Sequence, residues 1–198
     1  MIRPRLRRMG LMCLLAPVLL SPLEVHPAPP PDLAPLLDQA TRAATQQEYD
    51  RAIEALQSAL EQVRILAPLT AKPFLLVTEP AKFYGDYQPR QDAAFQRGEL
   101  LHFYLEPKNL VYPRTAQGVY EPAFGIDLQI LSAAGEVLAT QERFGGFRFS
   151  SRSPLQDIFV NLQVTLTGAP AGSYQIRFLV RDANSEKTTT VTHPVTLQ

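Results

Sequence analysis

The sequence predicts a mainly β protein: an antiparallel β-sandwich of about seven to eight strands over residues 69–198, preceded by an N-terminal α-helical hairpin. Several runs in the second half alternate apolar and polar residues with a period of two, most clearly over Asp157–Thr167. Such alternation is typical of strands with one buried face. Two runs between residues 33 and 63 instead carry apolar residues at helical spacing. Because no helical pattern separates the strands, an antiparallel sandwich is favoured over a parallel sheet.

The helical hairpin is predicted within residues 29–68, after a stiff Pro-rich spacer that runs from Pro27 to Pro31. In the first helix, Asp32 is the expected N-cap, and the apolar residues are Leu33, Leu36, Leu37, Ala40 and Ala44. The second helix ends before Pro68 and has a wide apolar stripe of Tyr49, Ala52, Ile53, Leu56, Ala59, Leu60 and Val63. We expect this stripe to be buried against a neighbouring part of the protein.

The second helix also resembles part of a known repeat. The stretch Gln47–Leu60 resembles the second half of a tetratricopeptide repeat, and Ala40, Ala52 and Ala59 fall where that repeat favours small residues. The resemblance implies a pair of closely packed helices. Only one unit is visible, whereas about three are needed for an independent solenoid. A single alanine-rich hairpin packed on its neighbour is therefore favoured.

The strands are predicted from residue 74 onward. They are Phe74–Thr78, Leu101–Leu105, Phe124–Ile130, Val137–Phe144, Phe147–Phe149, Ile158–Leu166, Tyr174–Arg181 and Thr188–Leu197. Ser132–Gly135 and Asp182–Ser185 are rich in turn-forming residues and are predicted to be tight connections. On the strand Leu101–Leu105, we expect His102 and Tyr104 to lie on the polar outer face.

One turn and the strand after it carry a resemblance to known folds. Pro170-Ala171-Gly172-Ser173-Tyr174, followed by an alternating run and Arg181-Asp182, is similar to the penultimate hairpin of immunoglobulin-like and fibronectin type III-like domains. The resemblance implies that the Tyr174 hydroxyl bonds back to the preceding loop, and that Pro170, Gly172 and Tyr174 have structural roles.

A second resemblance covers residues 74–197. Tyr84-Gly85-Asp86-Tyr87-Gln88-Pro89-Arg90, with Phe95 and Gly98-Glu99 after it, resembles a group of exported bacterial proteins of unassigned function. This likeness implies the fold and the compartment, and it brings no catalytic residue with it.

The N-terminal segment, residues 1–28, is predicted to be a signal peptide. Four arginines precede the apolar run Met9–Leu20, which is shorter than the roughly 20 residues that a membrane span needs. We place the cleavage between Ser21 and Ala28. The mature protein would then be periplasmic or secreted in a bacterium, with no transmembrane segment. A retained anchor and lipid attachment at Cys13 are the alternatives.

Loss of this leader would change the thiol content and the charge. Cys13 is the only cysteine, so the mature chain would contain no disulfide, no cysteine-based zinc site and no cysteine nucleophile. The whole chain has 19 basic and 19 acidic side chains; residues 1–28 contain four arginines and Glu24, which leaves 15 against 18. A mildly acidic chain without a basic run is not expected to bind nucleic acid.

No arrangement of residues typical of catalysis stands out. His26, His102 and His193 lack metal-ligand spacing, and neither an HExxH nor a GxSxG motif occurs. The carboxylates are scattered along the chain at Asp86, Glu106, Glu121, Asp127 and Asp157. We therefore expect no catalytic residue, no metal site and no cofactor, and we predict that the protein is not an enzyme.

Two groups of residues are candidates for a binding surface. One surrounds the flexible Gly145-Gly146 pair and consists of Arg143, Phe147, Arg148 and Arg152. The other combines aromatic and charged residues: Tyr84, Asp86, Tyr87, Arg90, Tyr112 and Tyr120. The favoured function is a non-enzymatic protein-interaction module of the cell envelope, with an envelope protein as partner. The alternative is a carbohydrate-binding accessory domain whose exposed tyrosines stack on a polysaccharide.

Overall fold

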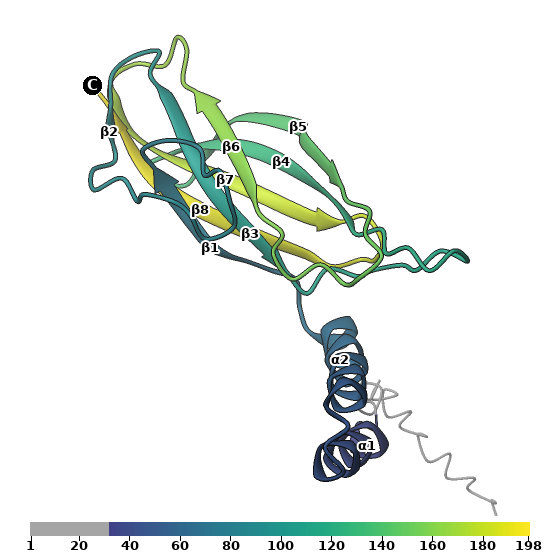
Figure 1. The fold of residues 1–198 in the computed structure, drawn as a ribbon. Helices are drawn as coiled ribbons and strands as arrows, with labels where there is room; N and C mark the ends of the chain where they lie inside the picture. The colour runs from purple at the N-terminus through teal and green to yellow at the C-terminus, as the bar shows by residue number, and fades with distance from the viewer. Residues whose placement is uncertain (1–31) are drawn as a thin grey trace, which may run out of the picture. The chain divides into compact units, whose positions relative to one another are not determined.

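The computed structural model describes residues 32–198, so the predicted signal peptide and the spacer up to Pro31 lie outside the described part of the chain. Two helices come first and strands follow (Figure 1): α1 (Ala34–Thr45), α2 (Tyr49–Leu66), β1 (Thr70–Val77), β2 (Ala94–Phe95), β3 (Leu100–Lys108), β4 (Ala123–Ser132), β5 (Val137–Arg148), β6 (Val160–Thr165), β7 (Gly172–Asp182) and β8 (Thr188–Leu197). Within residues 32–198, no helix combines the length and the hydropathy that a membrane crossing requires.

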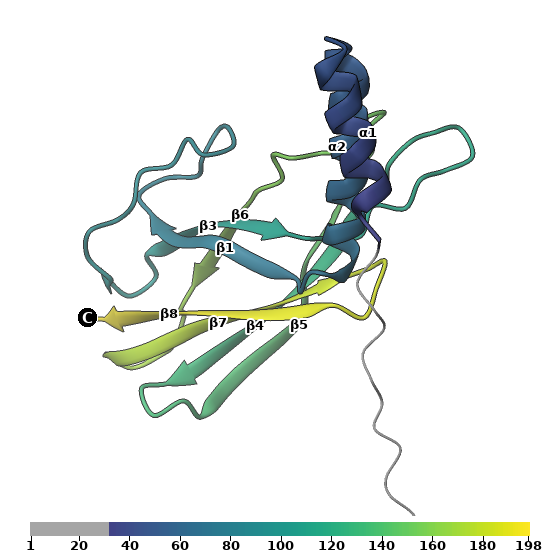
Figure 2. The same ribbon diagram turned by 90° about the horizontal axis from the view of Figure 1, so that it is seen from below.

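The strands form two layers, which Figure 2 shows from below. One sheet has three strands in the order β1-β3-β6, and the other has five in the order β2-β8-β7-β4-β5. All paired strands run antiparallel except β2 and β8, which are parallel. The mainly β prediction is confirmed, and so is the preceding helical hairpin. The predicted antiparallel arrangement holds for every strand pair except β2 and β8.

Two strand predictions need correction. Phe147–Phe149 is not a separate strand, because β5 continues through Gly145-Gly146 to Arg148 while paired with β4. Glycines are poor strand formers, so the sequence pattern breaks where the strand does not. The two-residue β2 was not predicted, since so short a strand shows no alternation. Its neighbourhood is fixed by backbone hydrogen bonds from Thr196 N–H to Ala93 (2.7 Å) and from Gln198 N–H to Phe95 (2.8 Å).

Both sheets contribute side chains to one apolar core. The predicted inward faces of the run 158–166, which contains β6, and of β7 are confirmed, with these residues buried: Ile158, Val160, Leu162, Val164 and Leu166, and Tyr174, Ile176, Phe178 and Val180. Across the layers, Phe103 of β3 meets Phe178 of β7 edge to face, with ring centroids 5.5 Å apart. This burial is the main stabilising contribution to the two-layer fold.

The helical hairpin is held together by alanines. Its buried residues are Ala40 and Ala43 of α1 and Ala52, Ala55 and Ala59 of α2. Small side chains allow the two helix backbones to approach closely. The predicted N-cap is shifted, because Leu33 occupies the cap position of α1 and Asp32 lies one residue earlier. The Asp32 carboxylate still accepts a hydrogen bond from Ala34 N–H at 3.1 Å, so it satisfies one free donor of the first turn.

Candidate functional site

The larger apolar side chains of the helical hairpin are exposed. In α2 one stripe consists of Tyr49, Ile53, Leu56, Leu60 and Val63, which are 44–63% exposed, and Leu37 of α1 is 46% exposed. Ile65 and Leu66 at the end of α2 are also exposed and lie outside this stripe. We call the five residues of the stripe and Leu37 the hairpin face. The expectation that the stripe would be buried is wrong for these residues, because the alanines alone fill the contact between the helices.

The six residues lie on the same side of the hairpin. Successive residues of α2 turn by 100° about the helix axis. In that sense of rotation, the exposed stripe lies further round the helix than Ala52 and Ala59. On α1, Leu37 is rotated in the same sense from the direction of Ala40 and Ala43. Because the helices of such a hairpin run antiparallel, equal rotations bring both sets of side chains to one side. The side chains of the hairpin face therefore point to one side of the hairpin.

The C-terminal end of α2 is fixed to the strand region by polar contacts of Arg64. The Arg64 guanidinium donates to the Gln156 side chain at 2.9 Å and lies over the Tyr112 ring, 5.0 Å from its centroid. The Lys187 ammonium donates to the Arg64 carbonyl at 2.8 Å. The Tyr112 hydroxyl donates to the Leu155 carbonyl at 2.8 Å. Tyr112, a predicted binding residue, is thus engaged in holding the helix end, and burial raises its pKa.

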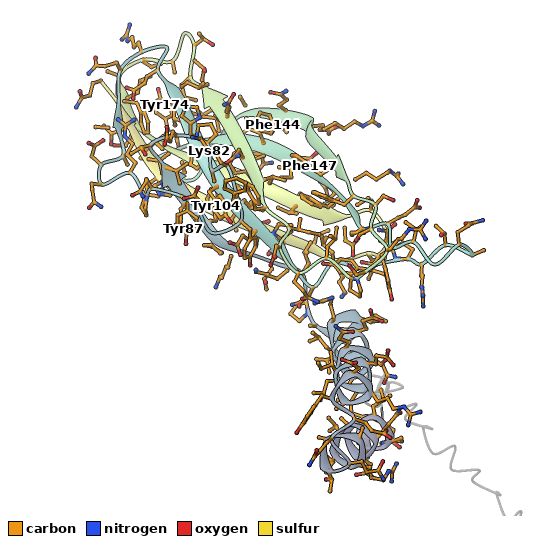
Figure 3. All side chains as sticks on the ribbon, in the orientation of Figure 1. Lys82, Tyr87, Tyr104, Phe144, Phe147 and Tyr174 are labelled. Atoms are coloured by element: carbon orange, nitrogen blue, oxygen red, sulfur yellow. The ribbon has the colours of Figure 1, made fainter. Side chains whose placement is uncertain are left out.

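Three other predicted binding residues lie in the loop between β1 and β2, residues 78–93. Tyr87 packs on Tyr104 of β3 with ring centroids 4.5 Å apart, and Figure 3 shows the two rings side by side. Tyr84 accepts a hydrogen bond from Lys108, whose ammonium lies 4.9 Å from the centre of the Tyr84 ring. Asp86 is exposed. The Tyr84 and Tyr87 rings are therefore already engaged by neighbouring protein groups.

Arg90, the fourth predicted residue of this region, holds the segment around β2. Its guanidinium contacts the carboxylates of Glu99 at 2.6 Å and Asp92 at 3.2 Å, and it donates to the Ala94 carbonyl at 2.7 Å. It also lies 4.0 Å from the centre of the Phe95 ring. The hydrogen bond to Glu99 raises the pKa of Arg90 and lowers that of Glu99. All of these contacts are within the chain, which indicates a structural role.

A buried polar network lies under the same loop and was not predicted from the sequence. The Glu106 carboxylate, on a residue only 4% exposed, accepts a hydrogen bond from the Tyr104 hydroxyl at 2.7 Å and pairs with Lys108 at 2.6 Å. The Tyr104 hydroxyl in turn accepts from Gly85 N–H at 2.8 Å. Burial raises the pKa of Glu106, but hydrogen bonds from Lys108, Tyr104 and Tyr84 outweigh it and hold that pKa below its ordinary value.

The position of Tyr104 corrects a prediction. It was expected on a polar outer face, but it is fully buried with Val77 and Ala81 in a second small core. Burial raises its pKa, so the hydroxyl stays protonated and donates to Glu106. The alternation Tyr104-Glu106-Lys108 on one strand face, together with the long loop that contains Tyr84, was the sequence signal for this network.

The predicted group around Gly145-Gly146 is divided between the two faces of β5. Phe147 points toward the core and stacks on Phe124, with ring centroids 5.0 Å apart. Arg143 has a left-handed backbone (φ 53°), and its N–H donates to the Asp127 carboxylate at 2.9 Å. Arg148 and Arg152 are exposed and have no ion-pair partner among residues 32–198. The structure therefore does not gather these four residues into one site.

Arg143 does border a polar depression on the outside of the five-stranded sheet. This open cavity has a volume of about 670 Å³, and its lining includes Asp127, Glu142, Arg143 and Arg181. Asp127 bonds Arg181 at 2.6 Å and accepts from Arg143 N–H; these contacts lower its pKa, the Arg143 bond contributing most. Within residues 32–198, no group of three or more potential metal ligands comes together.

The three residues with predicted structural roles lie at the start of β7. Tyr174 is 8% exposed, and its hydroxyl donates to the Pro170 carbonyl at 2.8 Å, so the expected bond to the preceding loop is present. Gly172 has φ 157°, and the Tyr174 ring lies 3.9 Å from the position that a Cβ at Gly172 would take. Tyr174 thus ties the loop to the strand.

Comparisons with known proteins give no assignment. No protein-family model matches the chain, and no curated protein matches its sequence. The alkylpurine DNA glycosylase AlkC of Pseudomonas fluorescens, solved with DNA containing an abasic-site analogue, has a TM-score of 0.32 at 13% identity, over 77% of this chain and 39% of that one.

Two further solved structures are similarly distant. The sulfur carrier protein SoxY of Chlorobium limicola has a TM-score of 0.26 at 8% identity, over 64% of this chain and 80% of that one. The sporulation control protein Spo0M of Bacillus subtilis has a TM-score of 0.33 at 7% identity, over 67% of this chain and 50% of that one. Likenesses this weak connect the chain to no family and carry no argument about its function.

Proposed function

We propose that this protein is an exported, non-enzymatic interaction module of the bacterial cell envelope that binds another protein through its hairpin face. The observation that carries the proposal is the exposure of the six large apolar side chains of that face, while the alanines fill the contact between α1 and α2. In this proposal the strand region is an immunoglobulin-like sandwich that serves as the scaffold, and residues 1–28 direct export.

The size of the hairpin face is compatible with a binding site. The largest apolar patch on a typical soluble monomer is roughly 300–600 Å², and such a patch is often functional. Each side chain of the face is about half exposed, so covering it completely would contribute on the order of 1 kcal/mol per residue. A partner helix laid along α2 would meet five of these side chains.

The carbohydrate-binding alternative has less support. Stacking on a sugar needs a free aromatic face, whereas Tyr87 packs on Tyr104, Tyr84 lies against Lys108 and Tyr112 lies under Arg64. Tyr120 likewise has the Arg114 guanidinium 5.3 Å from its ring centre. These contacts leave the hairpin face as the better candidate.

A matched pair of substitutions in α2 tests the proposal. Leu60→Glu places a charge in the hairpin face, whereas Ser58→Glu adds the same charge at an exposed position on another side of the helix. Both full-length variants are used to capture proteins from envelope extract after circular dichroism shows that the fold is intact. We expect Leu60→Glu to lose at least tenfold of the captured protein and Ser58→Glu to retain it. Equal capture by both variants would contradict the proposal.

A further inference from the structure

We propose that the occupant of the hairpin face is the same face of a second copy of this chain, so that two hairpins form an antiparallel four-helix bundle. This inference rests on the proposed function, because it names the partner of the surface proposed there. In the dimer, α2 of one copy lies along α2 of the other in the opposite direction.

The spacing of the exposed residues matches this partner. Along α2 they follow each other at intervals of four, three, four and three residues, from Tyr49 through Leu56 to Val63. This is the spacing of the two core positions of a heptad, which pack into the holes of a facing helix of the same kind. Helix bundles use such seams, with neighbouring helices crossing at about 20°. The stripe is therefore built to meet another long helix rather than a strand or a loop.

The area of the face is large enough for a reversible dimer. Six side chains, each about half exposed, leave roughly 500 Å² of apolar surface on one hairpin, since a large side chain can bury about 150–200 Å². Two hairpins would then bury roughly 1,000 Å², which is at the lower limit for a specific interface. The dimer is thus expected to be weak and to dissociate on dilution.

The charges beside the stripe select the antiparallel arrangement. Asp50 and Arg64 border the same edge of the stripe, seven residues on either side of Gln57, which is about 10 Å along the helix in each direction. When two α2 helices pack antiparallel about a twofold axis near Gln57, Asp50 of each copy approaches the end of α2 that carries Arg64 in the other. The Arg64 guanidinium keeps its contacts with Gln156 and Tyr112, so it attracts Asp50 through its charge and forms no new ion pair. In a parallel pairing, Asp50 and Arg64 of one copy would instead lie beside Ala52 and Ala59 of the other copy. The alanines have no charge to pair with them.

A second arrangement with twofold symmetry has α2 lying along α1 of the second copy. It lacks the match between Asp50 and a basic residue. The edge residues of α1 that α2 would then meet are Thr41, Thr45 and Asp38, which include no basic side chain to pair with Asp50. Gln57 would also lie far from its counterpart. The two arrangements therefore differ in whether the two copies of Gln57 face each other, which makes this position the best reporter.

A cysteine at that position tests the proposal directly. In the full chain with Cys13→Ser, Gln57→Cys supplies the only thiol, and Ser58→Cys is the matched control at an exposed position on the side of α2 opposite the stripe. Under mild oxidation at about 100 μM protein, we expect Gln57→Cys to form a disulfide-linked dimer and Ser58→Cys to yield at least tenfold less. Sedimentation of the unsubstituted chain should show a concentration-dependent dimer, and Leu60→Glu should weaken it more than tenfold.

The outcomes separate this inference from the function on which it rests. A chain that sediments as a monomer at all concentrations overturns the second-copy proposal, while capture of a different protein that Leu60→Glu abolishes would leave the proposed function standing. A dimer that persists in Leu60→Glu, or one in which Gln57→Cys does not cross-link, overturns the antiparallel bundle. If the hairpin face affects neither self-association nor capture, both proposals fail.

Discussion

Replacing Tyr174 tests how the loop before β7 is tied to the strand. The side chain is 8% exposed, and its hydroxyl donates to the Pro170 carbonyl at 2.8 Å. Tyr174→Phe removes this bond alone, and a lost hydrogen bond costs about 0.5–1.5 kcal/mol of unfolding free energy. Because Pro170 is exposed, its carbonyl can bond water instead, which places the cost near the lower end.

Tyr174→Ala should cost considerably more. It removes a buried ring from the core as well as the hydrogen bond, and large-to-small changes of this kind cost roughly 3–5 kcal/mol. In a chain of this size, such a loss lowers the melting temperature by roughly 6–20 °C. Against a total stability of about 5–15 kcal/mol, the variant should also express poorly.

Urea melts of the wild type and both variants measure these differences. Tyr87→Phe is the control, because the Tyr87 hydroxyl has no hydrogen-bond partner within residues 32–198. This substitution should change the unfolding free energy by less than about 0.5 kcal/mol. If Tyr174→Ala lies within about 0.5 kcal/mol of the wild type, the ring does not contribute to the core and the assignment of strand faces in β7 is wrong.

Two further substitutions probe other parts of the strand region. Glu106→Gln should lower the free energy of unfolding by about 1–3 kcal/mol at pH 7, because the charged bond to Lys108 is lost. Since the fold lowers the Glu106 pKa, this contribution is present above the ordinary carboxyl pKa and disappears as the pH falls through the lowered value. Urea melts of wild type and variant should therefore differ less at pH 3 than at pH 7, and an unchanged difference would contradict an ionised Glu106. Gly145→Ala should lower the free energy of unfolding by about 1–3 kcal/mol, because a Cβ there would lie 2.9 Å from the Phe147 ring. In Gly146→Ala the new Cβ meets nothing within 4 Å, so this control should be nearly neutral. Equal shifts in melting temperature for the two variants would refute this packing.

The inward faces of the strands were predictable because period-two alternation depends on local sequence alone. The residues of β6 and β7 that share one face, such as Val160 and Ile176, are buried as expected. The outer face of β3 was not predictable in the same way, since the residues that bury Tyr104 include Ala81 and Tyr87 of a distant loop and Phe159 just before β6. Alternation shows which side chains share a face, and it does not show how many faces are covered.

The helices show the same limit. Their existence and approximate ends followed from the apolar spacing, but the pattern could not show which apolar residues pair within the hairpin. Ala52 and Ala59 take that contact, and Leu56 and Leu60 are left exposed. Of the predicted binding residues, Arg90 and Tyr112 proved to have partners within the chain, which no local pattern reveals. The heptad spacing of the exposed residues was present in the sequence and was the signal for the hairpin face.

The loop over the three-stranded sheet has a consequence for proteolysis. Lys82 is exposed in this loop, and an exposed basic residue in a long loop is an expected site for trypsin. Its neighbours are nevertheless pinned, since Ala81 exchanges two hydrogen bonds with the Asn161 side chain and Gly85 N–H donates to Tyr104. A protease must open the segment around the cleaved bond, and opening this one would expose the buried Tyr104 ring. Cleavage after Lys82 should therefore be slow in the folded chain. Its rate would measure how often the loop of residues 78–93 opens away from the three-stranded sheet.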